Sequence, residues 1–397
     1  MDRRRFLTGA AALGILLTQR PERLAGLCGV TGPGRIGPAS GPGLVGCAPE
    51  AGRVGPRASG SALAVGVDPR IELYYAILHL SGFTLPEGAP APVMTGLRFA
   101  YREAVEERFE PFRGHGVVER YADMARRGFW LGHPVRAMLH LSDPPALAER
   151  APIDSFTTGM AGGRARLDAF LAGLRDFAID AGFVDWFAAQ ASGHRAMLAG
   201  CRAALDRDYV ADLVDYFGER CDSYTLILAP LAHAGGFGPP VRRADGGRAA
   251  FAVVGPKSIE DGVPAFGTPA QLRRLLWHEL SHSHVNHLTE RYLDGFMGPV
   301  TELQGHIRPE VERYVPWDVH VADWVSEHVV RGITTRLAYR ELGRAEGDAA
   351  LELELTGFPF TAEVAARLEQ YERRRDRYPT LADFYPELVA LFESVAG

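Results

Sequence analysis

The stretch Trp277-His278-Glu279-Leu280-Ser281-His282 places the pattern His-Glu-x-x-His inside a segment whose apolar residues recur at helical spacing. Residues four apart in a helix share a face, so His278 and His282 can offer two imidazoles to one metal ion while Glu279 lies beside them. This arrangement is typical of zinc hydrolases. The alternative is a polar helix face whose histidines have ordinary hydrogen-bond partners.

The residues around the motif supply the helical context that it requires. Thr268 is suited to cap a helix, Pro269 fits the first helical position, and leucines recur at positions 272, 275 and 276. We therefore predict a helix over residues 269–288.

A catalytic zinc site needs three protein ligands and an open position for water, so a third ligand must come from elsewhere in the chain. The extended metzincin motif has a glycine and a third histidine downstream, but Val285 and Leu288 stand at those positions here. That class of site is therefore excluded. The other common solution is a glutamate on a following helix.

Glu327 is our choice for the third ligand. Asp323 lies one helical turn before it and Arg331 one turn after it, so both can orient its carboxylate. An acid on an otherwise apolar helix is costly to bury without a metal or a partner. The alternative is an exposed ladder of ion pairs. The rival ligands, in falling order, are Asp323, His320, Glu302 and His306.

The wider pattern predicts an α+β fold that is mainly helical, with a small sheet next to the helix of the metal motif. Apolar runs at 62–67, 224–231 and 249–254 are predicted strands, the last two in a hairpin or in one sheet. In zincin-type hydrolases an extended substrate adds to a sheet edge over the metal helix. Residues 224–231 are our candidate for that edge, and a wholly buried strand is the alternative.

Helices are predicted where apolar residues recur at intervals of three and four. The predicted segments are 71–80, 164–177, 202–217, 361–375 and 380–395. Residues 295–317 are predicted to be largely a loop that leads to the helix of Glu327.

The composition is that of a globular chain with enough apolar residues for a full core, since 47% of 397 residues are hydrophobic. A net charge of −6 with scattered basic residues argues against a nucleic-acid partner. Lys257 is the only lysine. We attribute this arginine bias to a GC-rich bacterial genome.

The first residues have the charged and apolar regions of an export signal. Arg3-Arg4-x-Phe6-Leu7 resembles a twin-arginine signal, and the apolar run after it is too short to span a membrane. We therefore expect 1–25 to direct export to the periplasm or the extracellular space, 26–60 to be a Gly/Pro/Ala-rich linker, and 61–397 to form the folded domain.

The four cysteines form no Cys-x-x-Cys pair, so we do not expect them to bind zinc. Cys47 follows the lipoprotein-type box Leu44-Val45-Gly46, and lipid attachment there is the one membrane association that we consider. Cys201 and Cys221 can either form a disulfide in an oxidising compartment or remain buried thiols.

The sequence His-Glu-Leu-Ser-His-Ser-His-Val-Asn from His278 resembles the His-Glu-Phe-Ser-His-Ser-Phe-Val-Asn signature of a bacterial family, domain of unknown function 4932. That family resembles gluzincin-type metallopeptidases. The segment Val67-Asp68-Pro69-Arg70-Ile71-Glu72-Leu73 and the helix of Glu327 are also similar, so the resemblance spans 62–340. It implies a zincin-like metallopeptidase domain, with additional C-terminal helices.

The resemblance also implies roles for individual residues. His278 and His282 correspond to metal ligands, Glu279 to the catalytic acid and base, and Glu327 to the third ligand. The chain departs from the family pattern at His284 and His287, where the family has an aromatic residue and usually a proline. An additional metal or proton-transfer role is open for these two histidines, and exposed polar residues at a helix end are the simpler interpretation.

These residues favour hydrolysis of a peptide bond. Zinc would lower the pKa of a bound water to about 7, and Glu279 would take the water's proton and pass it to the leaving amine. An oxyanion stabiliser is also expected, with His233, Tyr314 and His320 as candidates. We therefore expect an exported zinc metallopeptidase that acts on peptides or proteins.

Two other functions are compatible with the sequence. One is a non-catalytic exported binding or scaffold protein that retains a zincin fold, in which a further ligand such as His284 or His320 would close a structural zinc site. The other is a metal-handling protein that uses His278, His282, His284 and His287 together.

Overall fold

The computed structural model describes residues 63–85, 92–303, 317–355 and 357–396, and for 317–320 the backbone alone. The predicted export signal, the linker and Cys47 lie outside the described residues, as do His306, Tyr314 and the side chain of His320. Among the described helices, none is long and apolar enough to cross a bilayer.

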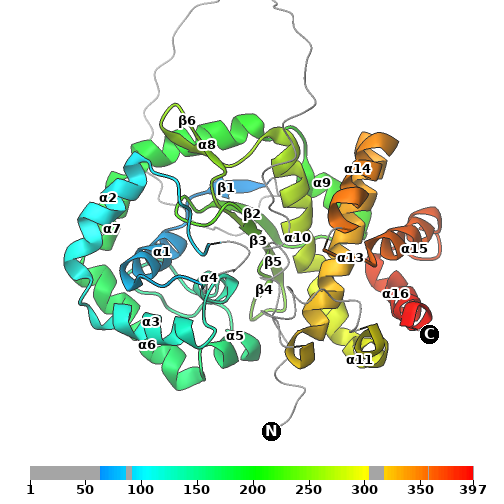
Figure 1. Ribbon diagram of the computed structural model, residues 1–397, viewed down its shortest axis with the longest axis horizontal. Coiled ribbons are helices and arrows are strands. Elements are labelled where there is room, and N and C mark those ends of the chain that lie inside the picture. Colours follow the sequence, from blue (N-terminus) through cyan, green and yellow to red (C-terminus); the bar gives the residue numbers. More distant parts are fainter. Residues whose placement is uncertain (1–62, 86–91, 304–316, 356, 397) are drawn as a thin grey trace, which may run out of the picture.

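A small mixed sheet lies between two groups of helices (Figure 1). Its strands are β1 (Ala64–Gly66), β2 (Ser223–Leu228), β3 (Gly236–Phe237), β4 (Val241–Arg242) and β5 (Arg248–Val254). β1, β2 and β5 are parallel neighbours in that order, and β3 and β4 pair with β5 in the antiparallel direction. A separate hairpin joins β6 (Ser258–Glu260) and β7 (Val263–Ala265).

The two short strands β3 and β4 form one interrupted edge strand. Phe237 pairs with Val253 and Val241 with Ala249, so both pieces keep a single register along β5. The intervening residues are Gly238, Pro239 and Pro240. Because proline has no N–H to donate, the ladder of hydrogen bonds breaks there.

The prediction that residues 224–231 form the sheet edge is wrong. β2 pairs with β1 on one side and with β5 on the other, so it is an interior strand. Its continuous apolar sequence is typical of a parallel strand that is buried on both faces. β2 and β5 therefore belong to one sheet and do not form a hairpin, and the edge on the side of β5 is the strand of β3 and β4.

Alternate residues of the central strands face two hydrophobic cores. Tyr224, Leu226 and Leu228 of β2 pack with the carboxyl-terminal helices, whereas Ile227 packs with the amino-terminal helices. β5 divides in the same way, with Ala252 on one face and Val253 on the other. The sheet is thus the middle layer of the fold.

Helices of the amino-terminal half cover one face of the sheet (Figure 1). They are α1 (Pro69–Ser81), α2 (Ala100–Phe109), the short 3-10 helix η4 (Glu110–Phe112), α3 (Gly116–Arg126), α4 (Gly132–Leu139), α5 (Ser155–Met160), α6 (Arg164–Asp180) and α7 (Phe183–Ala189). The next two helices are α8 (Ala191–Ala204) and α9 (Tyr209–Phe217), whose buried apolar residues belong to the core on the other face, where α9 contacts α10. The single helix predicted over 202–217 is wrong, because Asp208 accepts a hydrogen bond from the backbone of Ala211 and begins α9 anew.

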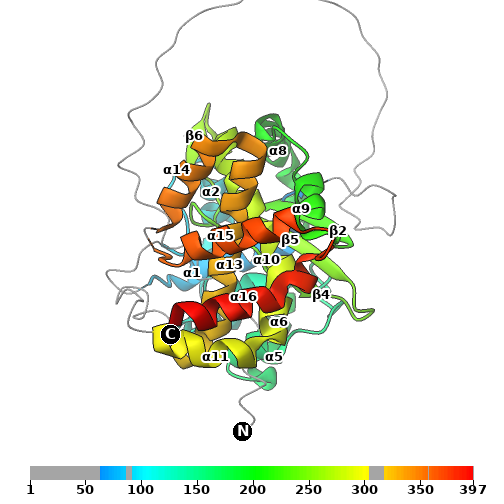
Figure 2. The same cartoon turned by 90° about the vertical axis from the view of Figure 1, so that its right-hand side faces the viewer.

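Helices of the carboxyl-terminal half cover the other face. They are α10 (Pro269–Arg291), α11 (Leu293–Glu302), α13 (Trp317–Leu342), α14 (Arg344–Leu355), α15 (Thr361–Arg373) and α16 (Leu381–Ala396). The loop predicted from residue 295 is wrong over its first part, which belongs to α11. Figure 2 shows α14, α15 and α16 on the outer side of α13, with α10 behind it.

The helix of the metal motif begins as predicted and extends further. Thr268 caps α10 and forms a reciprocal capping box with Gln271, and Pro269 occupies the first turn. α10 packs between the sheet and α13, which places the motif inside the carboxyl-terminal core. The fold is α+β and mainly helical, as predicted.

Candidate metal centre

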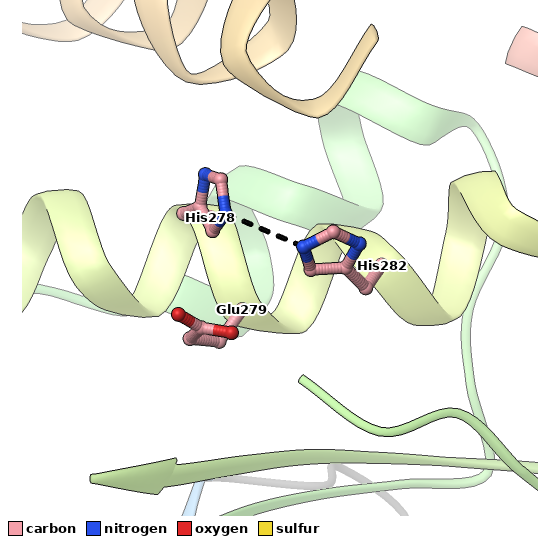
Figure 3. A group of neighbouring side chains, drawn as sticks. All are labelled: His278, Glu279 and His282. Carbon is pink, nitrogen blue, oxygen red and sulfur yellow. Dashed lines mark hydrogen bonds between the residues drawn. The ribbon is translucent and has the colours of Figure 1, made fainter. Parts of the chain in front are cut away.

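The two motif histidines lie side by side on α10 (Figure 3). Their Nε2 atoms are 3.3 Å apart and their rings are nearly perpendicular, at 79°. His282 is fully buried and His278 is 6% exposed. The prediction that His278 and His282 share one face of the helix is therefore confirmed, since both imidazoles face one point.

Glu327 reaches the same point from α13. Its Oε2 lies 3.6 Å from His278 Nε2, and its Oε1 lies 3.4 Å from His282 Nε2. Ligand atoms about 2.0–2.1 Å from a tetrahedral zinc are about 3.4 Å from one another. The three distances of 3.3, 3.4 and 3.6 Å among His278, His282 and Glu327 fit that separation.

Glu279 is the fourth polar side chain of this group. One of its ligating atoms lies within 4.8 Å of those of both histidines. Its carboxylate is directed toward the sheet (Figure 3), where a Cβ on Gly236 would come within 2.9 Å of its Oε1. Glu327 therefore matches the separation of ligands better, and Glu279 lies beside the metal position.

Burial affects the pKa values of three side chains at this centre. Desolvation lowers the pKa of His278 well below its ordinary value, which leaves the ring neutral and able to bind a metal. Desolvation and then the charge of Glu327 raise the pKa of Glu279. Burial also opposes ionisation of Glu327, but His282 and Arg331 outweigh it and lower its pKa.

The two buried carboxylates differ in their partners among the described residues. Neither oxygen of Glu279 accepts a hydrogen bond from a described group, whereas the oxygens of Glu327 have ion-pair contacts with His278, His282 and Arg331. Buried oxygens without a partner are rare in protein interiors because desolvation without compensation is costly. Two imidazoles and a carboxylate at this spacing fit a divalent cation, and their nitrogen and oxygen donors suit zinc.

A second carboxylate, Glu354 of α14, helps to hold Glu327. Arg331 approaches Glu327 Oε2 at 3.2 Å through one nitrogen and pairs with Glu354 through another. All three side chains are buried, and the guanidinium stacks on Phe358 at 3.8 Å from the ring centre. The exposed ladder considered from the sequence is therefore wrong, and Arg331 is a buried bridge.

Asp323, the other predicted partner of Glu327, has a different position. It is buried, and burial followed by the charge of Glu327 raises its pKa. Its Oδ1 has no hydrogen-bond partner in the described part of the chain. The charges of Asp323 and Glu327 therefore repel each other, whereas Arg331 makes the contact that orients the Glu327 carboxylate.

Asn286 orients the second histidine. Its Oδ1 lies 3.0 Å from His282 Nδ1, and a proton on Nδ1 donates to this oxygen and leaves Nε2 free to bind the metal. Asn286 belongs to the signature segment, but the sequence alone gave it no role. The signal that would have found it is its position one turn after His282 on the same face.

His284 and His287 are not exposed residues at a helix end, so that interpretation is wrong. His284 is fully buried, stacks on Phe217 at 4.2 Å and lies 3.1 Å from the hydroxyl of Tyr224. His287 lies 3.2 Å from a guanidinium nitrogen of Arg248. Both rings thus have partners away from His278 and His282.

The other candidates from the sequence are placed as follows. Glu302 is exposed at the end of α11. His233 is buried against Phe237 with neither ring nitrogen hydrogen-bonded to a described group, and burial, followed by Lys257, lowers its pKa to about 4. Cys201 and Cys221 are buried free thiols, so they form no disulfide.

The family model described as Domain of unknown function (DUF4932) matches residues 63–391. The match covers most of the chain, and the chain therefore belongs to this family. No curated protein and no solved structure matches it.

Proposed function

We propose that this member of the DUF4932 family is an exported, zinc-dependent metallopeptidase of gluzincin type. The observation that carries the proposal is the convergence of His278, His282 and Glu327, whose ligating atoms are 3.3 to 3.6 Å apart. Two histidines from one helix and a glutamate from a later helix, with a second glutamate beside them, are the side chains of a zincin-like catalytic site.

Each residue of the centre would have a separate role in peptide hydrolysis. Zinc bound there would lower the pKa of a water to about 7 and polarise the substrate carbonyl. Glu279 would accept the water's proton on its carboxylate and then deliver it to the leaving nitrogen of the peptide. Arg331 and Asn286 would keep Glu327 and His282 in place while this occurs.

The edge strand of β3 and β4 provides a route for binding an extended peptide. Gly235 accepts a backbone hydrogen bond from Gly255, and Arg243 donates one to Gly247, so the odd-numbered residues of this edge face β5 and its flanking residues. The backbone groups of Gly236 and Gly238 consequently point away from β5. Both glycines are buried, so an extended substrate would have to displace what covers them in order to pair beside Glu279, which touches the strand at Gly236.

Metal content and turnover of the purified full chain test the proposal. We expect one zinc per chain and hydrolysis of an unstructured protein such as casein. Glu279→Gln should keep the zinc and lose turnover, whereas Glu327→Ala should lose both. Glu302→Ala, which removes an exposed glutamate, is the matched control and should behave as the parent.

Two results would contradict this assignment. Full zinc binding by Glu327→Ala would remove Glu327 from the ligands, and undiminished turnover by Glu279→Gln would remove Glu279 from the chemistry. The export component is tested separately, by locating a reporter fused to residues 1–60 in a bacterial cell.

A non-catalytic exported protein is the second candidate, and the near-complete burial of His278, Glu279 and His282 favours it. A structural zinc site is closed by a fourth protein ligand, and Glu279 is the described carboxylate near enough to serve. In that case Glu279→Gln would weaken zinc binding. The peptidase proposal requires that it leave zinc binding intact.

A further inference from the structure

We propose that Arg274 and Lys257 form a carboxylate-binding subsite next to the metal centre, so that the substrates are peptides with a carboxylate close to the bond that is cut. The naming of the substrate rests on the proposed peptidase function. The existence of the subsite does not, because it is argued from the partners and positions of the two cations.

Arg274 lies on α10 one helical turn before His278. Its side chain is mostly buried, and its Nη1 atom has neither solvent contact nor a hydrogen-bond partner among the described residues. No described carboxylate forms an ion pair with it: burial lowers its pKa, and the charge of Glu354, which pairs with Arg331, opposes that effect only in part. Its neighbour Arg273 differs, since it pairs with Asp206 at 3.1 Å.

Lys257 approaches the same end of α10 from the sheet. It follows β5 by three residues, and a Cβ on Gly267 would lie 3.3 Å from its Cδ, so its stem runs beside the residue that precedes the helix cap. It is partly exposed, and no described group forms an ion pair with it. Burial and then the charge of Arg274 lower its pKa.

The acidic groups nearby are already engaged. Arg331 pairs with both Glu327 and Glu354, and Glu327 also faces the two motif histidines. The partial positive charge at the amino terminus of α10 adds to that of Arg274 and Lys257. Unpaired charges at such mostly buried positions are costly, and a bound anion would remove that cost.

The position of the subsite limits where the substrate carries its negative charge. One helical turn is about 5.4 Å along the helix axis, and an extended peptide advances about 3.3–3.6 Å per residue. A carboxylate held by Arg274 would therefore lie one or two residues from a carbonyl placed at His278 and His282. Either the carboxyl terminus of a peptide or an Asp or Glu side chain meets this requirement.

Binding of short acetylated peptides to the full, zinc-loaded chain tests the subsite without turnover when Glu279→Gln is present. The first pair is acetyl-Ala-Ala-Ala with a free carboxylate or a carboxamide. The second is acetyl-Ala-Glu-Ala-amide or acetyl-Ala-Gln-Ala-amide. We expect at least one acid to bind tenfold or more tightly than its neutral partner by calorimetry, as charged hydrogen bonds allow. The pair that shows the difference identifies the source of the carboxylate.

Variants of the two cations then locate the preference. Arg274→Gln and Lys257→Gln should each reduce the acid-to-neutral ratio by about tenfold, while Arg274→Lys should restore part of it. Arg273→Gln, on the same turn but paired with Asp206, should leave the ratio unchanged. Zinc content and circular dichroism of each variant confirm that the fold and the centre are intact.

The outcomes separate this proposal from the proposed function. Equal binding of acid and neutral probes, or no binding of either, overturns the subsite even if the chain hydrolyses casein. A preference that survives both Arg274→Gln and Lys257→Gln also overturns it. A preference that both variants abolish supports the subsite even if no hydrolysis is found.

Discussion

Replacing Glu354 by glutamine should weaken zinc binding although Glu354 does not touch the metal position. The carboxylate is 4% exposed and pairs with Arg331, which is 1% exposed and also contacts Glu327. Glutamine keeps the shape and an acceptor oxygen but removes the negative charge. Arg331 would then be compensated by Glu327 alone and would compete with zinc for that carboxylate.

The magnitude follows from the burial of the three side chains. Loss of a residue that orients a metal ligand typically weakens metal binding about 10- to 100-fold, or about 1.4 to 2.7 kcal/mol. Breaking a buried ion pair from one side costs about 3–5 kcal/mol of stability, and the retained acceptor places Glu354→Gln near 3 kcal/mol. Zinc affinity is measured by competition with a chelator, and stability by urea unfolding of the metal-free chain.

Glu372→Gln is the matched control. Glu372 of α15 pairs at 2.6 and 2.9 Å with Arg336, which lies on α13 like Arg331, and this pair is partly exposed. The control should lose about 1 kcal/mol of stability and keep its zinc affinity. Zinc binding by Glu354→Gln within twofold of the parent would refute the idea that Glu354 acts through Arg331 on Glu327.

Three further predictions concern the pH dependence of stability, the buried thiols and a glycine of the edge strand. Burial raises the pKa of Glu72 to about 8, so the folded state holds a proton that the unfolded state loses near pH 4.5. Stability should therefore fall between about pH 4.5 and 8, by at most about 5 kcal/mol, and urea unfolding should show this slope reduced in Glu72→Gln. Burial raises the pKa values of Cys201 and Cys221 to about 11, so both stay protonated and unreactive at pH 8. In a chain that carries Cys28→Ser and Cys47→Ser, a thiol reagent at pH 8 should label neither residue until the protein unfolds, and rapid labelling of the native chain would contradict their burial. Gly236→Ala would bring a Cβ within 2.9 Å of Glu279 Oε1 and should lower kcat about tenfold or more with zinc retained. The control Gly200→Ala, in open space on α8, should stabilise the fold by about 0.5–1 kcal/mol. A normal kcat in Gly236→Ala would show that Glu279 tolerates displacement.

Local signals in the sequence were sufficient for the helix that carries the motif. The cap at Thr268, the proline after it and the spacing of His278 and His282 are all contained within two dozen neighbouring residues. The choice of Glu327 also used a local pattern, namely an acid between an aspartate and an arginine on an apolar helix. The structure brings this carboxylate to the two histidines, although its part in binding a metal is still a prediction.

Features that depend on pairing between distant segments could not be predicted in the same way. A continuous apolar run such as that of β2 has the same sequence whether a neighbour pairs with one side or with both, and the error over residues 224–231 follows from this. The edge strand was hidden because Gly236, Gly238 and two prolines have low strand propensity. Glu354 follows a Leu-Glu-Leu repeat that does not distinguish it from Glu352.

The interrupted edge strand has a consequence for self-association. Pro239 faces β5 and Pro240 faces away from it, so the outward side has no N–H at residue 240. The donors at Gly236 and Gly238 belong to buried residues, and a strand from a second copy of the chain that reached them would lose the ladder immediately afterwards. An edge of this kind can accept a short peptide, yet it offers no continuous template for the growth of a sheet between molecules.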